Sequence, residues 1–130
     1  MSSYYKILVV IFIFMLETAL YGQTNVINTS FHKTGLYEYI GENPGYLIKR
    51  TKNRQIEYNK ETKQKLVFKI SWILDNEYEL EFIRHHNFPG CLRKGYIINT
   101  IIVESNPERY TCEWKTQYCG NGIVKFKKIK

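Results

Sequence analysis

The chain has 130 residues, a formal net charge of +7 and a hydrophobic content of 44%. This length provides for one compact hydrophobic core and excludes two cores of useful size. Lys and Arg are scattered along the chain with Glu among them, so the charge indicates solubility rather than a dedicated nucleic-acid surface. We therefore do not expect nucleic acid as a partner.

The N-terminal segment has the pattern of a secretory signal peptide. Lys6 precedes an unbroken apolar run over residues 7–16, and Glu17 follows it. A membrane-spanning helix needs roughly 20 apolar residues, so we expect no permanent span after cleavage. Cleavage is expected after Gly22, with Ala19 as the alternative, and the mature protein is expected to be secreted or periplasmic. The chain then divides into a signal helix over residues 1–22, an extended lead-in over 23–34 and a single β domain over 35–130.

The lead-in over residues 23–34 is polar and has no apolar period, so we expect it to lie outside the core. His32 falls in this segment without any sign of a special role. Further along, residues 96–103 are apolar on both faces, which predicts that something covers the outer face. We expect the lead-in to do so through its apolar residues, with a partner chain as the alternative; these residues are Val26, Ile27 and Phe31.

After Gly35 the chain reads as short strands joined by turns. Residues 66–72 and 77–83 each alternate apolar with polar side chains, which indicates strands with one buried face. We expect these two strands to form a hairpin with a three-residue connection through Asp75 and Asn76, and with Lys69 near Glu81. The other strands are expected over residues 36–40, 46–51, 54–59, 96–104, 109–117 and 123–129.

These elements predict an all-β fold, an antiparallel meander of about eight strands. A small barrel is preferred to a two-layer sandwich because closure removes exposed strand edges. The interior of an eight-stranded barrel is either filled by side chains or wide enough for one small ligand. Large inward side chains favour the filled form, namely Phe68, Trp72, Tyr78, Phe82 and Trp114.

The three cysteines are Cys91, Cys112 and Cys119. In an exported protein they are first of all disulfide candidates, and an odd number leaves one unpaired. In a meander the connections that carry Cys91 and Cys119 lie at the same end of the sheet, whereas Cys112 alternates with Tyr110 and Trp114 on an apolar face. We therefore predict a disulfide between Cys91 and Cys119 and a buried thiol at Cys112.

Neither a metal site nor a catalytic site is expected. His85 and His86 precede Cys91, but adjacent strand residues point to opposite faces, so at most one of these histidines could join a site with that thiolate. The carboxylates of Glu77, Glu79 and Glu81 form one solvated row rather than a facing pair. With no nucleophile motif or phosphate-binding loop present, we expect a protein that is not an enzyme and has no cofactor.

Residues 34–83 carry a longer pattern. It consists of T-G-L-Y-E-Y from Thr34, R-x-x-x-x-Q-x-E from Arg50 and I-x-W-x-x-D-x-x-Y-x-L from Ile70. This pattern resembles small exported lipocalin-like β-proteins of Bacteroidetes, whose function is uncharacterised and some of which are mislabelled as DNA topoisomerase IV. The resemblance implies mainly structural roles for the matched residues Gly35, Tyr37, Arg50, Gln55, Glu57, Trp72, Asp75, Tyr78 and Leu80.

This chain departs from the pattern in its cysteines. Many relatives have Cys directly after the hairpin Asp and another Cys shortly before T-G, whereas this chain has Asn76 and no cysteine before Cys91. Both members of that pair are missing together. The departure is compatible with a disulfide nearer the C-terminus.

Three functions fit these expectations. The first is a non-enzymatic exported β-barrel-like domain that binds a small apolar ligand or an envelope component. The second is a protein-binding module, such as a hydrolase inhibitor or an envelope assembly factor, that uses the loop over residues 84–94. The third is polyanion binding through residues 125–128. The loop is basic and Phe88 is expected to be exposed; its candidate contact residues are Arg84, His86, Phe88 and Arg93. An open apolar pocket of several hundred Å³ would favour ligand binding, and a solid interior would favour surface contacts.

Overall fold

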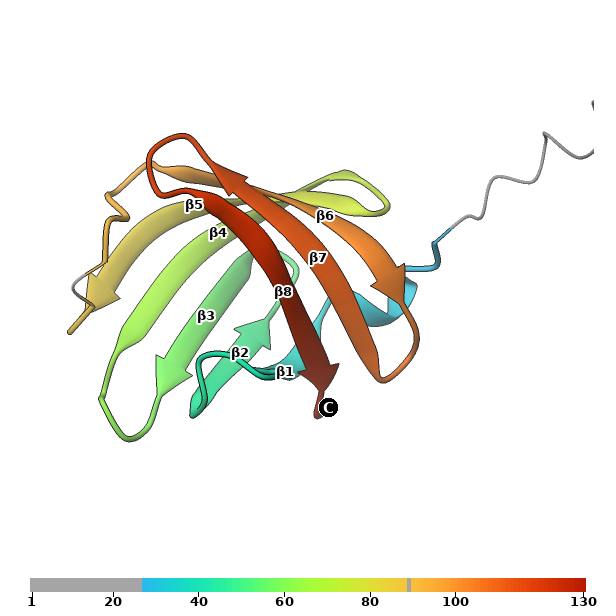
Figure 1. Ribbon diagram of the computed structural model, residues 1–130, viewed down its shortest axis with the longest axis horizontal. Helices are drawn as coiled ribbons and strands as arrows, with labels where there is room; N and C mark the ends of the chain where they lie inside the picture. Colours follow the sequence, from blue (N-terminus) through green and yellow to red (C-terminus); the bar gives the residue numbers. More distant parts are fainter. Residues whose placement is uncertain (1–26, 89) are drawn as a thin grey trace, which may run out of the picture.

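The computed structural model describes residues 27–88 and 90–130, so the expected signal helix lies outside the described residues. A short 3-10 helix, η1 (Ser30–His32), precedes eight strands (Figure 1). The strands are β1 (Gly35–Tyr39), β2 (Tyr46–Arg50), β3 (Arg54–Asn59), β4 (Lys65–Leu74), β5 (Glu77–His86), β6 (Ile97–Ser105), β7 (Arg109–Thr116) and β8 (Asn121–Lys128). Within the described part, no helix has the length and apolar character needed to cross a membrane.

The eight strands form a closed antiparallel barrel. Each strand pairs with its neighbour in the chain, and β8 returns to pair with β1, where Tyr39 lies opposite Phe126. Closure leaves no free sheet edge, which is the physical reason why the barrel was preferred to a sandwich. The all-β prediction is confirmed, and the strand ends differ from those expected by no more than three residues.

β4 and β5 form the expected hairpin, with Lys69 opposite Glu81. The connection has two residues, 75–76, rather than three. The register shifts after Trp72, and Ile73 is the extra residue that this bulge takes up. The hairpin therefore keeps the predicted inward alternation on both strands while turning more tightly than expected.

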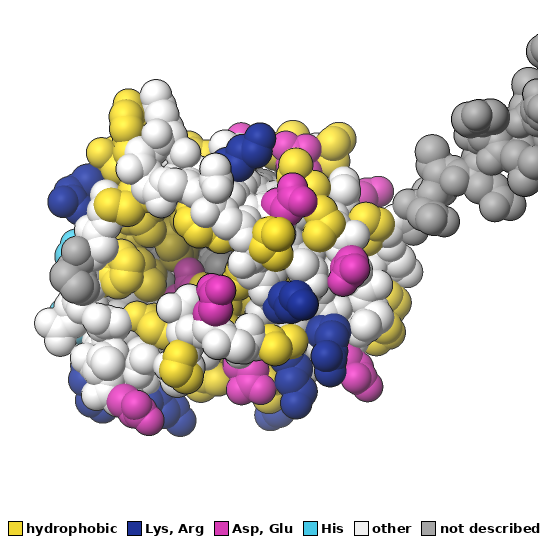
Figure 2. Space-filling view, viewed as in Figure 1, with side chains coloured by type: hydrophobic (Ala, Val, Ile, Leu, Met, Phe, Trp, Pro, Cys, Tyr) yellow, Lys and Arg dark blue, Asp and Glu magenta, His cyan; other side chains and the backbone are white. Residues whose placement is uncertain are grey.

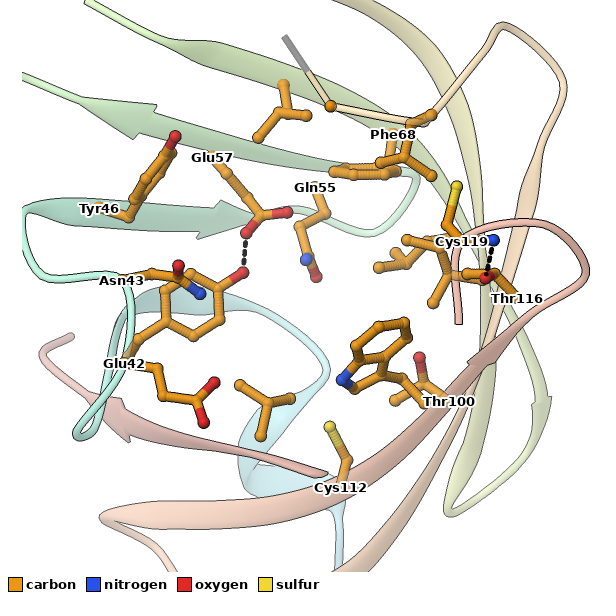
Figure 3. A pocket seen from close by; sticks show the side chains of 18 of the residues that line it. Glu42, Asn43, Tyr46, Gln55, Glu57, Phe68, Thr100, Cys112, Thr116 and Cys119 are labelled. Carbon is orange, nitrogen blue, oxygen red and sulfur yellow. Dashed lines mark hydrogen bonds between the residues drawn. The ribbon is translucent and has the colours of Figure 1, made fainter. Parts of the chain in front are cut away.

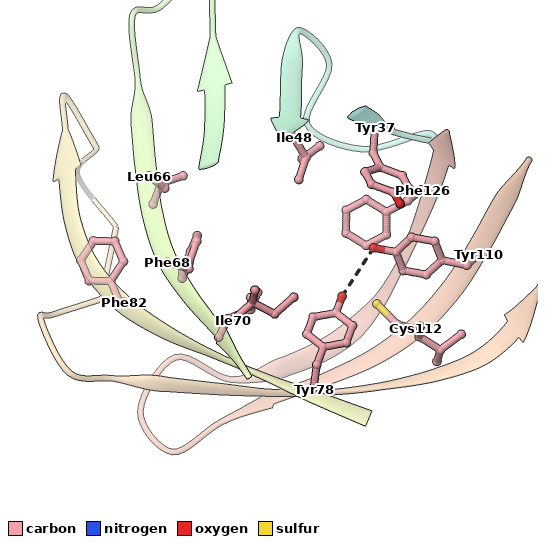
Figure 4. Close-up of a cluster of buried hydrophobic side chains, with 12 residues drawn as sticks. Tyr37, Ile48, Leu66, Phe68, Ile70, Tyr78, Phe82, Tyr110, Cys112 and Phe126 are labelled. Carbon is pink, nitrogen blue, oxygen red and sulfur yellow. Dashed lines mark hydrogen bonds between the residues drawn. The ribbon is translucent and has the colours of Figure 1, made fainter. Parts of the chain in front are cut away.

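The core consists of side chains that point inward at alternate positions of all the strands except β3 (Figure 4). Several are large and fully enclosed, including Tyr37, Tyr78 and Tyr110, whose exposed fractions are 1% or less. The core cluster comprises Tyr37, Ile48, Leu66, Phe68, Ile70, Tyr78, Leu80, Phe82, Ile102, Tyr110, Cys112 and Phe126.

One end of the barrel is closed by the segment that precedes β1. His32 in η1 is fully buried, its Nε2 atom lies 2.7 Å from the carbonyl oxygen of Asn106, and its ring centroid lies 4.7 Å from that of Tyr110. The buried Thr29 hydroxyl donates to the carbonyl oxygen of Asp75 in the β4–β5 turn. The expectation that this segment lies outside the core is therefore wrong for Thr29 and His32, because both side chains fasten η1 to turns between strands.

The outer face of β6 is not covered as the sequence suggested. Ile101 and Val103 are each 37% exposed, and Ile27 packs against the core cluster instead. The lead-in, as far as the structure describes it, lies across the end of the barrel rather than along its side. The predicted cover is wrong for the described residues, and Val26 lies outside them.

Candidate ligand-binding cavity

The end of the barrel opposite η1 is hollow. A cavity of about 350 Å³ opens between the β1–β2, β5–β6 and β7–β8 connections. Figure 2 shows a hollow on this side of the molecule, with hydrophobic side chains along its wall. The volume falls within the range of roughly 300–1,000 Å³ that small-molecule sites occupy, so the interior has room for one small ligand.

Apolar and aromatic side chains make up most of the wall (Figure 3). They come from β4 to β8 and from the β5–β6 loop, and they include Leu66, Phe68, Leu80, Phe88, Leu92, Ile98, Trp114, Val124 and Phe126. A wall of this kind favours apolar groups, because their transfer out of water is stabilising by about 25 cal/mol per Å² of apolar surface.

A polar group stands on the other side of the cavity. The Tyr39 hydroxyl donates a hydrogen bond to the Glu57 carboxylate, and Gln55 also hydrogen bonds to it. Burial raises the pKa of the Glu57 carboxyl, an effect that these two hydrogen bonds and the charge of Arg50 partly offset. Burial and the neighbouring carboxylate raise the pKa of Tyr39 well above its usual value, so its hydroxyl stays a donor.

The floor of the cavity rests on a buried guanidinium. Arg50 donates to the side-chain oxygen of Gln55 at 3.0 and 2.7 Å, to the carbonyl oxygen of His32 at 2.8 Å and to the Tyr110 hydroxyl at 2.6 Å. Burial opposes its charge, but Tyr110, Tyr78 and Tyr37 outweigh that effect and raise the pKa of Arg50. This network links η1 to β2, β3 and β7, and it separates the solid end of the barrel from the hollow end.

The rim of the cavity is joined by a disulfide. Cys91 in the β5–β6 loop bonds to Cys119 in the β7–β8 connection, with Cα atoms 5.9 Å apart, and both residues line the opening. Cys112 is unpaired and buried in the wall. The predicted pairing is confirmed, as is the burial of the third thiol.

The four loop residues expected to make contacts do not gather into one site. Arg84, His86 and Arg93 have exposed side chains, and the Arg93 guanidinium donates to the carbonyl oxygens of Gly90 and Leu92 in its own loop. Phe88 differs from the expectation of an exposed ring, since it is half-buried and lines the cavity. Of the four, Phe88 alone lies among the described residues that line the cavity.

Sequence reasoning assigned no binding role to the polar residues of the cavity. Glu57 and Gln55 were expected to be structural, and Tyr39 received no role, although all three line the opening. Their one signal in the sequence was the position of a carboxylate on the inward face of a strand, since Glu57 lies between the outward residues Ile56 and Tyr58. Acids are rarely buried without a partner, so a Glu on the inward face of β3 is a sequence feature that could have indicated a functional site.

Comparisons of the chain with models of protein families, with curated proteins and with solved structures find no match. In residues 27–88 and 90–130, no group of three or more His, Cys, Asp or Glu side chains is arranged to hold a metal ion. His85, one of the two histidines considered as metal ligands from the sequence, instead stacks on Phe82, with ring centroids 5.9 Å apart.

Proposed function

We propose that this protein is an exported, non-enzymatic binding domain whose barrel holds one small, mainly apolar ligand. The observation that carries this proposal is the cavity of about 350 Å³ at the open end of a closed eight-stranded barrel. Eight-stranded barrels hold single small ligands in lipocalins, which is the likeness that the sequence pattern suggested. The disulfide and the signal-like N-terminal run support export.

The cavity coexists with the large side chains that were expected to fill the barrel. Tyr78 lies at the deep end of the cavity, whereas Phe68 and Trp114 lie along its wall. Next to η1, Tyr37 and Tyr110 are fully buried with ring centroids 5.8 Å apart, and the His32 ring packs 4.7 Å from that of Tyr110. The aromatic side chains thus fill one end of the barrel and leave the other end open, which favours the ligand-binding function over surface contacts alone.

Protein binding through the β5–β6 loop has less support. An interface needs buried anchors, which are commonly aromatic, and the expected aromatic anchor of this loop, Phe88, lines the cavity instead. The other three candidate contact residues, Arg84, His86 and Arg93, are exposed and offer no apolar anchor. We therefore assign the loop to the wall of the binding cavity.

The proposal is tested with a neutral apolar dye, N-phenyl-1-naphthylamine, whose fluorescence rises when it leaves water. The mature protein with its disulfide intact is expected to bind the dye saturably. Ile98→Trp should weaken binding at least tenfold, because Ile98 lines the cavity and the larger ring would occupy it. The matched control is Ile123→Trp, which places the same ring on the outside of β8, where the native side chain is 60% exposed.

Circular dichroism establishes that both variants retain the fold. Saturable binding by wild type and by the control, with loss in Ile98→Trp, would support the cavity as the site. Absence of saturable binding by wild type, or equal affinity in Ile98→Trp, would overturn the proposal.

A further inference from the structure

The charge of the cavity is opposite in sign to that of the whole chain. The chain has 19 Lys and Arg against 12 Asp and Glu. Among the described residues that line the cavity there are two acids, Glu42 and Glu57, and no Lys, Arg or His. A wall that simply sampled the composition would contain more bases than acids, so the acidic lining is a property of this site.

The two acids lie on the same side of the cavity. Glu57 belongs to β3 and Glu42 to the β1–β2 connection, and Figure 3 shows both carboxylates on the side opposite Thr116 and Cys119. This arrangement makes the cavity amphipathic. One side offers negative charge, and the side formed by β4 to β7 offers apolar surface.

Two aromatic rings stand beside the deeper acid. Tyr39 and Tyr46 both line the cavity, and their ring centroids lie 6.3 Å apart in an edge-to-face arrangement. Both hydroxyls are already engaged, that of Tyr39 with Glu57 and that of Tyr46 with Gln64. Phe126 packs against the Tyr39 ring, with centroids 5.0 Å apart, so the two tyrosines form part of an aromatic wall beside the carboxylate. A cation that enters there would meet this wall, and a contact between a cation and a ring face is worth about 0.5–2 kcal/mol.

Glu57 has no direct cationic partner in the described part of the chain. Its hydrogen-bond partners, Tyr39 and Gln55, are neutral. The nearest buried base is Arg50, which lies beneath the floor and directs its donors to Gln55, Tyr110 and the carbonyl oxygen of His32. A buried carboxylate is costly unless it is paired, and in this cavity the ligand is in a position to supply the pairing charge.

From these observations we infer that the ligand is a small apolar molecule with one ammonium group, bound with that group between Glu57, Glu42 and the rings of Tyr39 and Tyr46. This inference rests on the proposed ligand-binding function and deepens it. A fatty acid or another apolar anion is disfavoured in this orientation, because its carboxylate would meet two acids and no base among the described lining residues. A two-chain lipid exceeds the volume of about 350 Å³.

The test compares three ligands with the same ten-carbon chain: decylamine, decanol and decanoate. Each is measured at pH 7.5, below the concentration at which it aggregates or separates from solution, by displacement of N-phenyl-1-naphthylamine from the mature protein. We expect decylamine to bind at least tenfold more tightly than decanol, and decanoate to bind more weakly than both. A fourth ligand, lysophosphatidylethanolamine, separates a free amine from a lipid headgroup, because it carries the ammonium group next to a phosphate.

Three variants test which acidic residue causes the preference for decylamine over decanol. Glu57→Gln keeps the shape of the side chain and can still accept the Tyr39 hydrogen bond, so the preference for decylamine over decanol should fall to within about twofold. Glu42→Gln should reduce the preference less, because Glu42 is exposed at the rim. The matched control is Glu113→Gln on β7, whose exposed side chain is not among the residues that line the cavity.

The outcomes separate the two proposals. If decanol and the dye bind but decylamine shows no advantage, or keeps its advantage in Glu57→Gln, the ammonium assignment is overturned and the binding function stands. If lysophosphatidylethanolamine binds more tightly than decylamine, the ligand is a headgroup rather than a free amine. If wild type binds none of these molecules, both proposals fail.

Discussion

Replacement of Arg50 by methionine tests the network that divides the closed end of the barrel from the cavity. Arg50→Met keeps much of the aliphatic volume and removes every donor of the guanidinium. Two buried acceptors then lose their partners, the side-chain oxygen of Gln55 and the carbonyl oxygen of His32. The hydroxyls of Tyr78 and Tyr110 lie 3.5 Å apart and can remain partners of each other.

The expected loss of stability in Arg50→Met comes mainly from those two acceptors. An unsatisfied buried acceptor costs about 1–3 kcal/mol, and loss of the contacts between the guanidinium and three tyrosine rings adds to this cost. The variant no longer buries a charge, which offsets part of this cost. We therefore expect Arg50→Met to lower the free energy of unfolding by about 3 kcal/mol, which a domain with the usual 5–15 kcal/mol survives.

Urea unfolding, followed by circular dichroism at pH 7.5 with the disulfide intact, measures this difference. The matched control is Arg54→Met, which changes an exposed arginine at the start of β3 and should shift stability by no more than about 0.5 kcal/mol. A loss below about 1 kcal/mol in Arg50→Met, or one equal to the control, would show that the buried network contributes little to stability.

Three further predictions concern other parts of the barrel. Burial, together with the charges of Lys128 and Arg50, lowers the pKa of His32, so the unfolded chain binds the proton more tightly and stability should fall as pH drops below about 6.5. The difference in unfolding free energy between wild type and His32→Gln should then shrink between pH 7.5 and 5.5; a constant difference would contradict this reasoning. Replacement of both Cys91 and Cys119 by Ala should cost about 3.6 kcal/mol, from a closed loop of about 29 residues, and lower Tm by roughly 15 °C. Calorimetry measures this shift in Tm. A shift below about 5 °C would mean that the closed loop contributes much less stability than its loss of conformational entropy predicts. A Cβ atom at Gly122 would lie 3.0 Å from the indole nitrogen of Trp114, so Gly122→Val should push that ring into the cavity and weaken binding of the neutral dye at least threefold. Unchanged dye affinity would mean that the ring has room to move elsewhere.

The barrel was predictable from the sequence because its signals are local. Alternation along residues 66–72 places successive side chains on opposite faces, and the turn residues between strands fix where each strand ends. The disulfide followed from the same logic, since alternate connections of a meander lie at the same end. Cys91 and Cys119 sit in two such connections, and the structure joins them.

The closed end and the cavity were not predictable, because they depend on contacts between residues far apart in the chain. His32 is polar and looked peripheral, yet its partner Asn106 lies 74 positions away. Phe88 was expected to be exposed, because a loop sequence does not show on which side of a rim its ring will lie. The large inward side chains favoured a filled interior, but residue size does not show how those side chains are distributed along the barrel axis, and that distribution leaves one end hollow.

Three sulfur atoms border this one small space, and their chemistry protects its entrance. Exchange of a disulfide begins with attack by a thiolate, so a third cysteine beside a bridge is ordinarily a hazard. Burial raises the pKa of the Cys112 thiol to about 12, which leaves about one molecule in 100,000 ionised at pH 7. In the oxidising compartment that we propose, Cys112 is therefore too weak a nucleophile to scramble the bridge between Cys91 and Cys119, and the mouth keeps its original pairing.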